Sequence, residues 1–274
     1  MTARLTSLCL ICLLLSHASC RRERALGPPK AVPVATDGRI ELRLMTFNVR
    51  HENDDDVGSR AWRQRVAGIV RMIREEAPDV IGIQEARHGQ TADLWASLPD
   101  YEFVGRARDD GRRGGEYAGI FYRRDRFEAD AADQGTFWLS DTPRQAGSKT
   151  WGNGIPRTAT WLRLTDRASH RGFYVFNTHW DHRHQGAREK SARLTAERIR
   201  ARRRAGEPVV LLGDATSTPS RATRPWQVSP PGRDSSTPST RCTRTSATAA
   251  RSTSGTTRAR AASKSITSSS AGVP

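Results

Sequence analysis

The amino-acid composition changes abruptly after Asp214, and this change limits which part of the chain can fold. Residues 215–274 contain no Leu and no Phe, and 26 of these 60 residues are Ser or Thr. Such a segment buries too little apolar surface to offset the entropy that is lost on ordering. We therefore expect residues 215–274 to be disordered, with a single globular domain within residues 39–214.

The first twenty residues have the pattern of an export signal. Arg4 precedes an apolar run from Leu5 to Leu15 that is too short to span a bilayer. We interpret residues 1–20 as a signal peptide and residues 21–38 as a flexible tether. Cys20 resembles the acceptor cysteine of a bacterial lipoprotein, so membrane attachment through a lipid on Cys20 and plain secretion are both open. The expected location is outside the cytoplasm: periplasmic, secreted or anchored by lipid to the cell envelope.

The cysteines exclude a disulfide-rich protein, and the distribution of charge weakens the case for a protein that binds nucleic acid or anionic surfaces. Only one of the four cysteines, Cys242, lies beyond the signal segment, which excludes a disulfide framework. The net charge of +16 is typical of proteins that bind nucleic acid or anionic surfaces. However, nine Arg or Lys and one Asp in residues 215–274 supply half of that charge. The charge therefore says little about partners of the folded domain.

Local patterns predict strands and helices that are interspersed along residues 39–214. Trp62, Val66, Ile69, Val70 and Ile73 have helical spacing and predict a helix with one apolar face, ending before Pro78. A basic helix is expected over residues 186–204. The predicted strands are 42–49, 80–84, 117–122, 158–164, 173–177 and 209–212. Because strands and helices do not alternate strictly, a mixed α/β sandwich fits better than a doubly wound sheet.

Polar residues end four of the apolar, strand-like runs: Asn48, Glu85, His179 and Asp214. If the strands end at the same edge of a sandwich, these side chains meet there. Hydrolysis of a phosphoester needs oxygen ligands for Mg²⁺, a group that activates water, and donors for the phosphoryl oxygens. Carboxylates, an amide and an imidazole supply these functions.

Four motifs carry a resemblance to a known superfamily. They are Thr46-Phe47-Asn48-Val49-Arg50, Pro78 to Glu85, Asn177-Thr178-His179-Trp180-Asp181-His182 and Leu211-Leu212-Gly213-Asp214. In this order and spacing they resemble the endonuclease/exonuclease/phosphatase superfamily, which includes DNase I. Gly115-Glu116-Tyr117 and Phe137-Trp138-Leu139-Ser140 are similar to an exported bacterial branch of it.

The resemblance implies a four-layer αββα sandwich and a phosphoester hydrolase that uses Mg²⁺ or Mn²⁺. It implies that Glu85 and Asn48 serve the metal, that His179 binds the scissile phosphate, and that Asp214 orients or deprotonates the attacking water. Arg50 and Asp181 are further candidates for binding phosphate or substrate, with a supporting or surface role for Asp181 as the alternative. The substrate class stays open among nucleic acid, a phospholipid head group and a sugar phosphate, and we expect a monomer.

The family pattern breaks after Asp214. A Gly-Asp-Phe-Asn motif, a distal Asp-Tyr-Ile segment and a final Ser-Asp-His are expected, whereas Ala215-Thr216-Ser217 follows Gly213-Asp214. Residues 213–219 can be encoded with the string GCGAC in tandem, and removing one copy restores Gly-Asp-Phe-Asn. The same frame recovers Ile-Asp-Tyr-Ile from residues 264–270. We hypothesise a frameshift after Asp214, which leaves the C-terminal part of the second sheet missing or disordered and impairs catalysis.

The alternative to a hydrolase is a non-catalytic protein, either a truncated remnant or a basic protein that binds nucleic acid or an anionic surface. Binding through the basic residues would weaken steeply with salt. A hydrolase would instead lose activity with a metal chelator and on substitution of Glu85 or His179.

Overall fold

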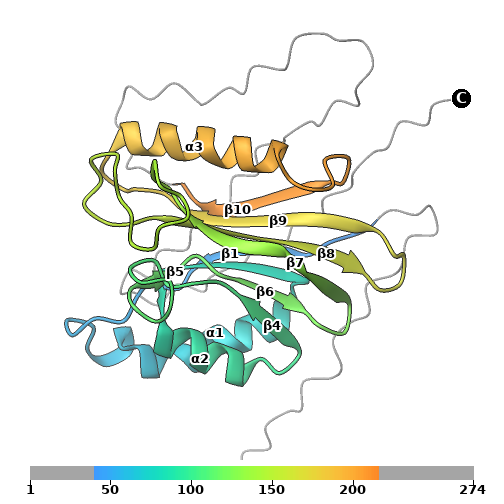
Figure 1. Ribbon diagram of the computed structural model, residues 1–274. Helices are drawn as coiled ribbons and strands as arrows, with labels where there is room; N and C mark the ends of the chain where they lie inside the picture. The colour runs from blue at the N-terminus through green and yellow to red at the C-terminus, as the bar shows by residue number, and fades with distance from the viewer. Residues whose placement is uncertain (1–39, 216–274) are drawn as a thin grey trace, which may run out of the picture.

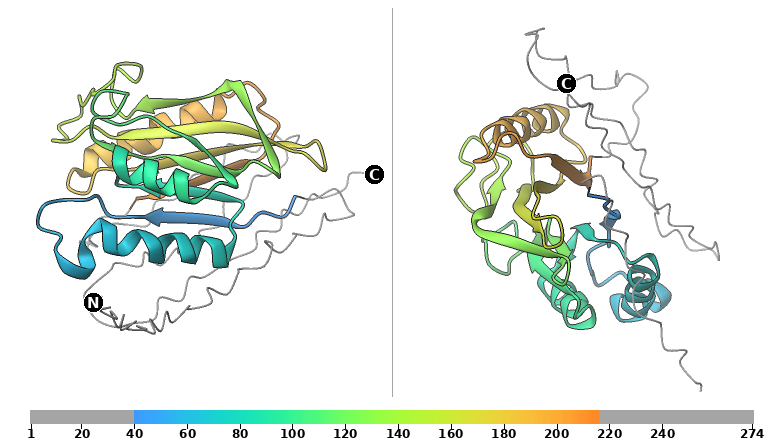
Figure 2. Two further views of the ribbon diagram at one scale, coloured as in Figure 1. Left: turned by 90° about the horizontal axis from the view of Figure 1, so that it is seen from below. Right: turned by 90° about the vertical axis from the view of Figure 1, so that its right-hand side faces the viewer.

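The computed structural model describes residues 40–215, and the chain forms four layers there (Figure 1). Helices α1 (Trp62–Glu76) and α2 (His88–Ser97) cover the outer face of one sheet. Helix α3 (Gln185–Arg200) covers the outer face of the other sheet. The right-hand view in Figure 2 shows α3 and α1 on opposite outer sides of this stack. The predicted four-layer sandwich is confirmed, and the segments 1–39 and 216–274 lie outside the described residues.

The first sheet has the strand order β1-β2-β6-β4. Its strands are β1 (Leu44–Asn48), β2 (Val80–Gln84), β6 (Ile120–Arg123) and β4 (Tyr101–Val104). Strands β1 and β2 are parallel, with Asn48 opposite Gln84. Both therefore end at the same edge of the sheet, so Asn48 and Glu85 lie at that edge.

The second sheet has the strand order β10-β9-β8-β7. Its strands are β10 (Val209–Asp214), β9 (Gly172–His179), β8 (Thr158–Asp166) and β7 (Phe127–Trp138). Strands β9 and β10 are parallel, and Asp214 is registered with His179. A small ribbon, β3 (Ala86–Arg87) with β5 (Glu116–Tyr117), and a 3₁₀ turn, Gly58–Arg60, complete the described elements.

The structure differs from the sequence-based prediction in several places, and helix α2 and strand β4 are elements that the sequence did not predict. The strand expected over 117–122 is divided between β5 and β6, and the interruption includes Gly119, where an added Cβ would be 2.3 Å from the Phe103 ring. Helix α3 ends at Arg200, and the Arg202 guanidinium donates to the carbonyl of Ile199 beside that end. Strand β7 was not predicted, because a register shift between Ala129 and Gln134 breaks its alternation.

Three apolar clusters lie between the layers. Helix α1 buries Trp62, Ile69, Val70 and Ile73 against the first sheet, as the helical spacing predicts. The cluster between the sheets contains Val80, Ile120, Leu162, Leu164, Val175 and Leu212. The third cluster lies beneath α3 and includes Tyr174, Phe176 and Ala187. Trp95 on α2 lies outside these clusters and is 46% exposed.

Near the edge that carries the strand-end residues, buried amides tie the two sheets together. The Asn177 side chain on β9 donates to the carbonyls of Ile83 and Gly119, both at 2.8 Å. Gln84 donates to Asn177 Oδ1 at 2.8 Å. Buried amides contribute to stability only when they are paired in this way, so they hold the sheets in one register.

Gly82 allows this close approach, and a methyl group there should weaken the fold. A Cβ on Gly82 would lie 2.6 Å from Asn177 Oδ1 and 2.9 Å from Leu212 Cβ. We expect Gly82→Ala to lower the free energy of unfolding by about 1–3 kcal/mol in urea titrations, because the sheets must separate. Gly68→Ala in α1 is the control: its Cβ meets nothing within 4 Å, and it should stabilise by about 0.5–1 kcal/mol. Equal effects of the two substitutions would contradict the prediction.

Candidate active site

Three of the predicted site residues meet at the edge where β1, β2 and β10 end. The Asn48 amide donates to Glu85 Oε1 at 2.7 Å and to Asp214 Oδ2 at 3.0 Å. The first contact joins neighbouring strands of one sheet, and the second crosses to the other sheet. One amide therefore positions two carboxylates that are 129 residues apart in the chain.

Glu85 adopts an uncommon backbone conformation directly after β2. Its φ is 67°, in the left-handed region that costs a non-glycine residue on the order of 1 kcal/mol. The His51 N–H donates to Glu85 Oε2 at 3.3 Å, and the Asn48 contact holds the other oxygen. Burial acts to raise the pKa of Glu85, but the Asn48 hydrogen bond, the charge that His179 carries when it is protonated, and the His51 hydrogen bonds outweigh it, so the net shift is downward. Glu85 is therefore ionised at neutral pH.

The donor set at this edge fits a hard divalent cation. Two carboxylates and an amide are oxygen-rich, and Mg²⁺ is usually held by one or two carboxylates while it keeps several waters. Within residues 40–215 no group of three or more His, Cys, Asp or Glu side chains is arranged as a metal cage. Glu85, Asp214 and Asn48 are therefore oxygen donors of the type that hard divalent cations prefer.

His179 is held by a buried arginine that the sequence analysis did not single out. Arg157, which precedes β8, donates through Nη1 to His179 Nδ1 and through Nη2 to His182 Nδ1, both at 3.1 Å. A guanidinium can only donate, so both Nδ1 atoms must be acceptors. A neutral His179 therefore carries its proton on Nε2 and can donate a hydrogen bond from that atom.

The surroundings of His179 also keep it neutral. Burial and the neighbouring charge of Arg157 lower the pKa of His179 to about 4, although Asp214 and Glu85 act in the opposite direction. At neutral pH the imidazole is thus a neutral donor of one hydrogen bond. This state suits the binding of a phosphoryl oxygen better than general acid catalysis, for which a pKa near the working pH is best.

The low pKa of His179 should make the protein less stable in acid. Between about pH 6.5 and 4 the unfolded chain binds a proton on this side chain and the folded chain does not, so stability falls as the pH falls. In EDTA, we expect the free energy of unfolding to drop by about 2 kcal/mol from pH 7 to pH 5 through this group. His179→Asn should remove that part of the pH dependence. If urea titrations give the same pH dependence of the free energy of unfolding for His179→Asn and the unsubstituted protein, the assignment to His179 is wrong. Because the pKa of Glu116 is raised, this group stabilises the folded chain as the pH falls. It does so in the unsubstituted protein and in His179→Asn alike, so the comparison between them reports on His179.

A second acidic group lies beside Glu85 and was noticed in the sequence only as part of a motif. His51 Nδ1 is 3.3 Å from Glu85 Oε2 and 3.5 Å from Glu116 Oε1. Glu116 also forms an ion pair with Arg108. Burial raises the pKa of Glu116, the Arg108 charge opposes this, and the Glu85 charge adds to it, with a net upward shift. The motif Gly115-Glu116-Tyr117 was the available signal, but it did not show that Glu116 would reach Glu85.

Two predicted substrate-binding residues have other partners in the structure. Arg50 forms a bidentate pair with Asp56, at 2.9 and 2.7 Å. The carboxylate of Asp56 is buried in this ion pair. Asp181 accepts hydrogen bonds from the N–H groups of Arg183 and His184, at 2.8 and 2.7 Å, just before α3. Asp181, which is buried, thus organises the turn into that helix and has a supporting role, not a surface role.

Comparisons with known proteins identify the family. Residues 45–265, more than half of the chain, match the model of the Endonuclease/Exonuclease/phosphatase family. The chain belongs to this family. No curated protein matches its sequence.

Three solved family structures illustrate the similarity. An endonuclease/exonuclease/phosphatase from Bacteroides vulgatus is 38% identical, with a TM-score of 0.61, over 64% of this chain and 66% of that one. A family protein from Bacteroides thetaiotaomicron is 35% identical, with a TM-score of 0.61, over 65% of this chain and 64% of that one. A mannosyl-6-phosphatase from Bacteroides thetaiotaomicron is 36% identical, with a TM-score of 0.60, over 64% of this chain and 65% of that one. This family member therefore spans just under two thirds of the length of each of these structures.

Proposed function

We propose that this family member is a phosphoester hydrolase that depends on Mg²⁺ or Mn²⁺ and uses water as the nucleophile. The observation that carries the proposal is the contact of Asn48 with both Glu85 and Asp214, beside the His179–Arg157 pair. Carboxylates for a divalent cation and neutral donors for phosphoryl oxygens are the groups that phosphoryl transfer requires.

Each residue has a distinct role in the proposed reaction. Glu85, with Asn48, would hold the cation, which supplies Lewis-acid stabilisation of the phosphoryl charge when it is bound. His179 binds a phosphoryl oxygen through Nε2–H. Asp214 orients the attacking water and accepts its proton as the new P–O bond forms and the ester P–O bond breaks.

We also propose that catalysis by this chain is impaired by a frameshift after Asp214. The support is that Ala215-Thr216 follows Gly213-Asp214 in place of the expected Phe-Asn, so the second amide is missing at this position. Groups of this kind each contribute about 10²–10⁴-fold to a rate. Sequencing the gene from codon 205 past its stop tests the frameshift. A tandem GCGAC supports it. A gene that has neither the repeat nor a recoverable reading frame refutes it.

The decisive experiment compares this chain with the chain translated after removal of one repeat copy. With Mg²⁺, the restored chain should hydrolyse a phosphomonoester or phosphodiester at least about 100-fold faster, and EDTA should abolish the reaction. If the restored chain is inactive on nucleic acid, phospholipid head-group and sugar-phosphate substrates, the proposed function is wrong. If both chains are equally active, the proposed impairment is wrong.

The competing proposal is a basic protein that binds nucleic acid or anionic lipid without catalysis, for which the net charge of +16 is the supporting observation. Its affinity for DNA or anionic vesicles should then fall steeply as salt rises and should be indifferent to EDTA.

We further propose export, on the basis of the pattern in residues 1–20. No helix within the described residues, 40–215, is long and apolar enough to cross a membrane. Mass spectrometry of the mature N-terminus in the native host tests this: cleavage before Cys20 with a lipid adduct indicates anchoring, cleavage without lipid indicates secretion, and an intact Met1 refutes export.

A further inference from the structure

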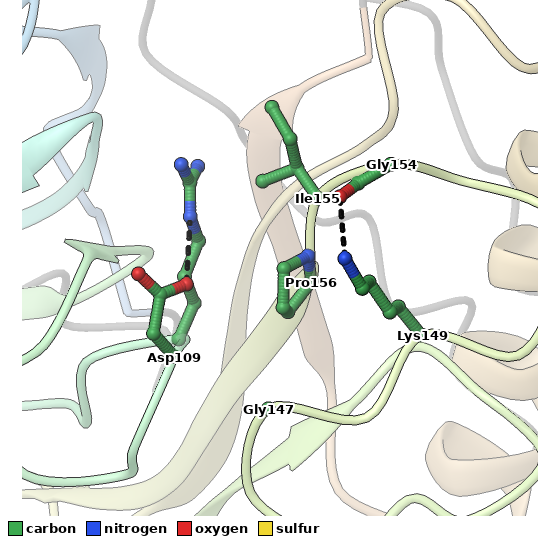
Figure 3. Close-up of a pocket in the computed structure, with 7 residues that line it drawn as sticks. Asp109, Gly147, Lys149, Gly154, Ile155 and Pro156 are labelled. Atoms are coloured by element: carbon green, nitrogen blue, oxygen red, sulfur yellow. Dashed lines mark hydrogen bonds and ion pairs between the residues drawn. The ribbon is translucent and has the colours of Figure 1, made fainter.

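A pocket beside the candidate active site is built from two loops. It has a volume of about 450 Å³, within the range of roughly 300–1,000 Å³ that is usual for small-molecule sites. Figure 3 shows Asp109 on one side and Ile155, Pro156 and Lys149 on the other. The first loop connects β4 to β5, and the second connects β7 to β8.

Two residues that line the pocket are linked to residues around the site that is proposed to bind phosphate. Arg108 lines the pocket and also pairs with Glu116, which reaches Glu85 through His51. On the opposite wall, Pro156 directly precedes Arg157, which holds His179. The pocket therefore borders the site at Glu85 and His179 where a phosphoester would bind.

The two walls are packed directly against each other, so the pocket is preformed. A Cβ on Gly147, whose φ is 74°, would lie 2.5 Å from the carbonyl oxygen of Asp109. The Trp138 indole N–H donates to the carbonyl of Arg108 at 2.5 Å. Preformed walls lower the entropy cost of binding a small ligand.

The lining residues offer hydrogen bonds at its rim and a small apolar face. The Asp109 side chain is 52% exposed and accepts hydrogen bonds. Lys149 donates to the carbonyl of Gly154 at 2.9 Å, which leaves further N–H donors on its ammonium group. Ile155 and Pro156 add apolar contact surface.

This chemistry suits hydroxyl groups, which both donate and accept, on a ring with C–H faces. None of the described residues that line the pocket is aromatic, and aromatic stacking is the usual means of holding a nucleic-acid base. The apolar surface is also small for an acyl chain. We propose that the pocket binds a polyhydroxylated leaving group, so that the substrate is a sugar phosphate. This inference rests on the proposed hydrolase function.

Binding of non-hydrolysable phosphonates to this chain in Mg²⁺, measured by calorimetry, tests the inference without turnover. The probes are methylphosphonate, the methylene phosphonate of a hexose 6-phosphate, and a nucleoside phosphonate. The hexose compound should bind about tenfold more tightly than methylphosphonate, and Lys149→Met should remove most of that difference without changing methylphosphonate affinity. Lys190→Met is the matched control, because Lys190 lies over the Trp151 ring and does not line the pocket; it should change neither affinity.

The outcomes separate the pocket from the phosphate site. If the hexose phosphonate binds no better than methylphosphonate, or the nucleoside phosphonate binds best, the sugar-phosphate inference is overturned while the hydrolase proposal stands. An equal loss of both affinities in Lys149→Met also overturns it. If methylphosphonate itself does not bind, and Glu85→Gln makes no difference, both proposals fail.

Discussion

Glu85→Gln should lower Mg²⁺-dependent hydrolysis by about 10³-fold or more and should weaken Mn²⁺ binding. The substitution keeps the shape of the side chain and an oxygen that can accept from Asn48 Nδ2, which lies 2.7 Å from Glu85 Oε1. It removes the charge that a divalent cation requires, and with it several kcal/mol of transition-state stabilisation. Hydrolysis is measured in the chain with the restored frame, and Mn²⁺ binding is measured in this chain by electron paramagnetic resonance.

The control for Glu85→Gln is Glu75→Gln on α1. The Glu75 side chain is 56% exposed and pairs at 3.9 Å with Arg71 on the same helix. Loss of the Glu75 charge should therefore change neither the rate of hydrolysis nor the affinity for Mn²⁺. Full Mn²⁺ affinity in Glu85→Gln would show that this carboxylate does not hold the cation, and the metal role would pass to other residues.

Arg157→Met should lower hydrolysis by about 100-fold and change the tautomer of His179. In the protein, donation from the guanidinium at 3.1 Å requires Nδ1 of His179 to be an acceptor. Without Arg157 the proton can occupy either nitrogen, so the Nε2–H donor is no longer fixed toward a phosphoryl oxygen. The ¹⁵N chemical shifts of the His179 ring report the tautomer directly, and a loss of stability alone would not move them.

Two further variants separate positioning from simple packing. Arg157→Lys keeps the charge but loses the forked donors that reach His179 and His182, so partial recovery of activity is expected. Arg163→Met removes another largely buried arginine from the same sheet, whose partner is Glu207. It should leave the His179 shifts unchanged. Unaltered shifts in Arg157→Met would mean that another group sets the tautomer.

Local patterns in the sequence were sufficient for much of the architecture. The spacing of apolar residues located α1, and short apolar runs located β2, β8, β9 and β10, because side-chain periodicity depends mainly on local backbone geometry. Irregular elements escaped this reasoning. The alternation of β7 is broken by its register shift, and α2 mixes buried Gln90 and Thr91 with exposed Trp95.

The sequence by itself determined that Asn48, Glu85, His179 and Asp214 end apolar strands, and the family motifs suggested their chemistry. Only the tertiary structure decided which side chains meet. It brought Arg157 to His179, Glu116 to His51 and Asp56 to Arg50. The reason is physical. Strand periodicity is a local property of the chain, whereas these contacts depend on how the loops fold and how the two sheets pack against each other.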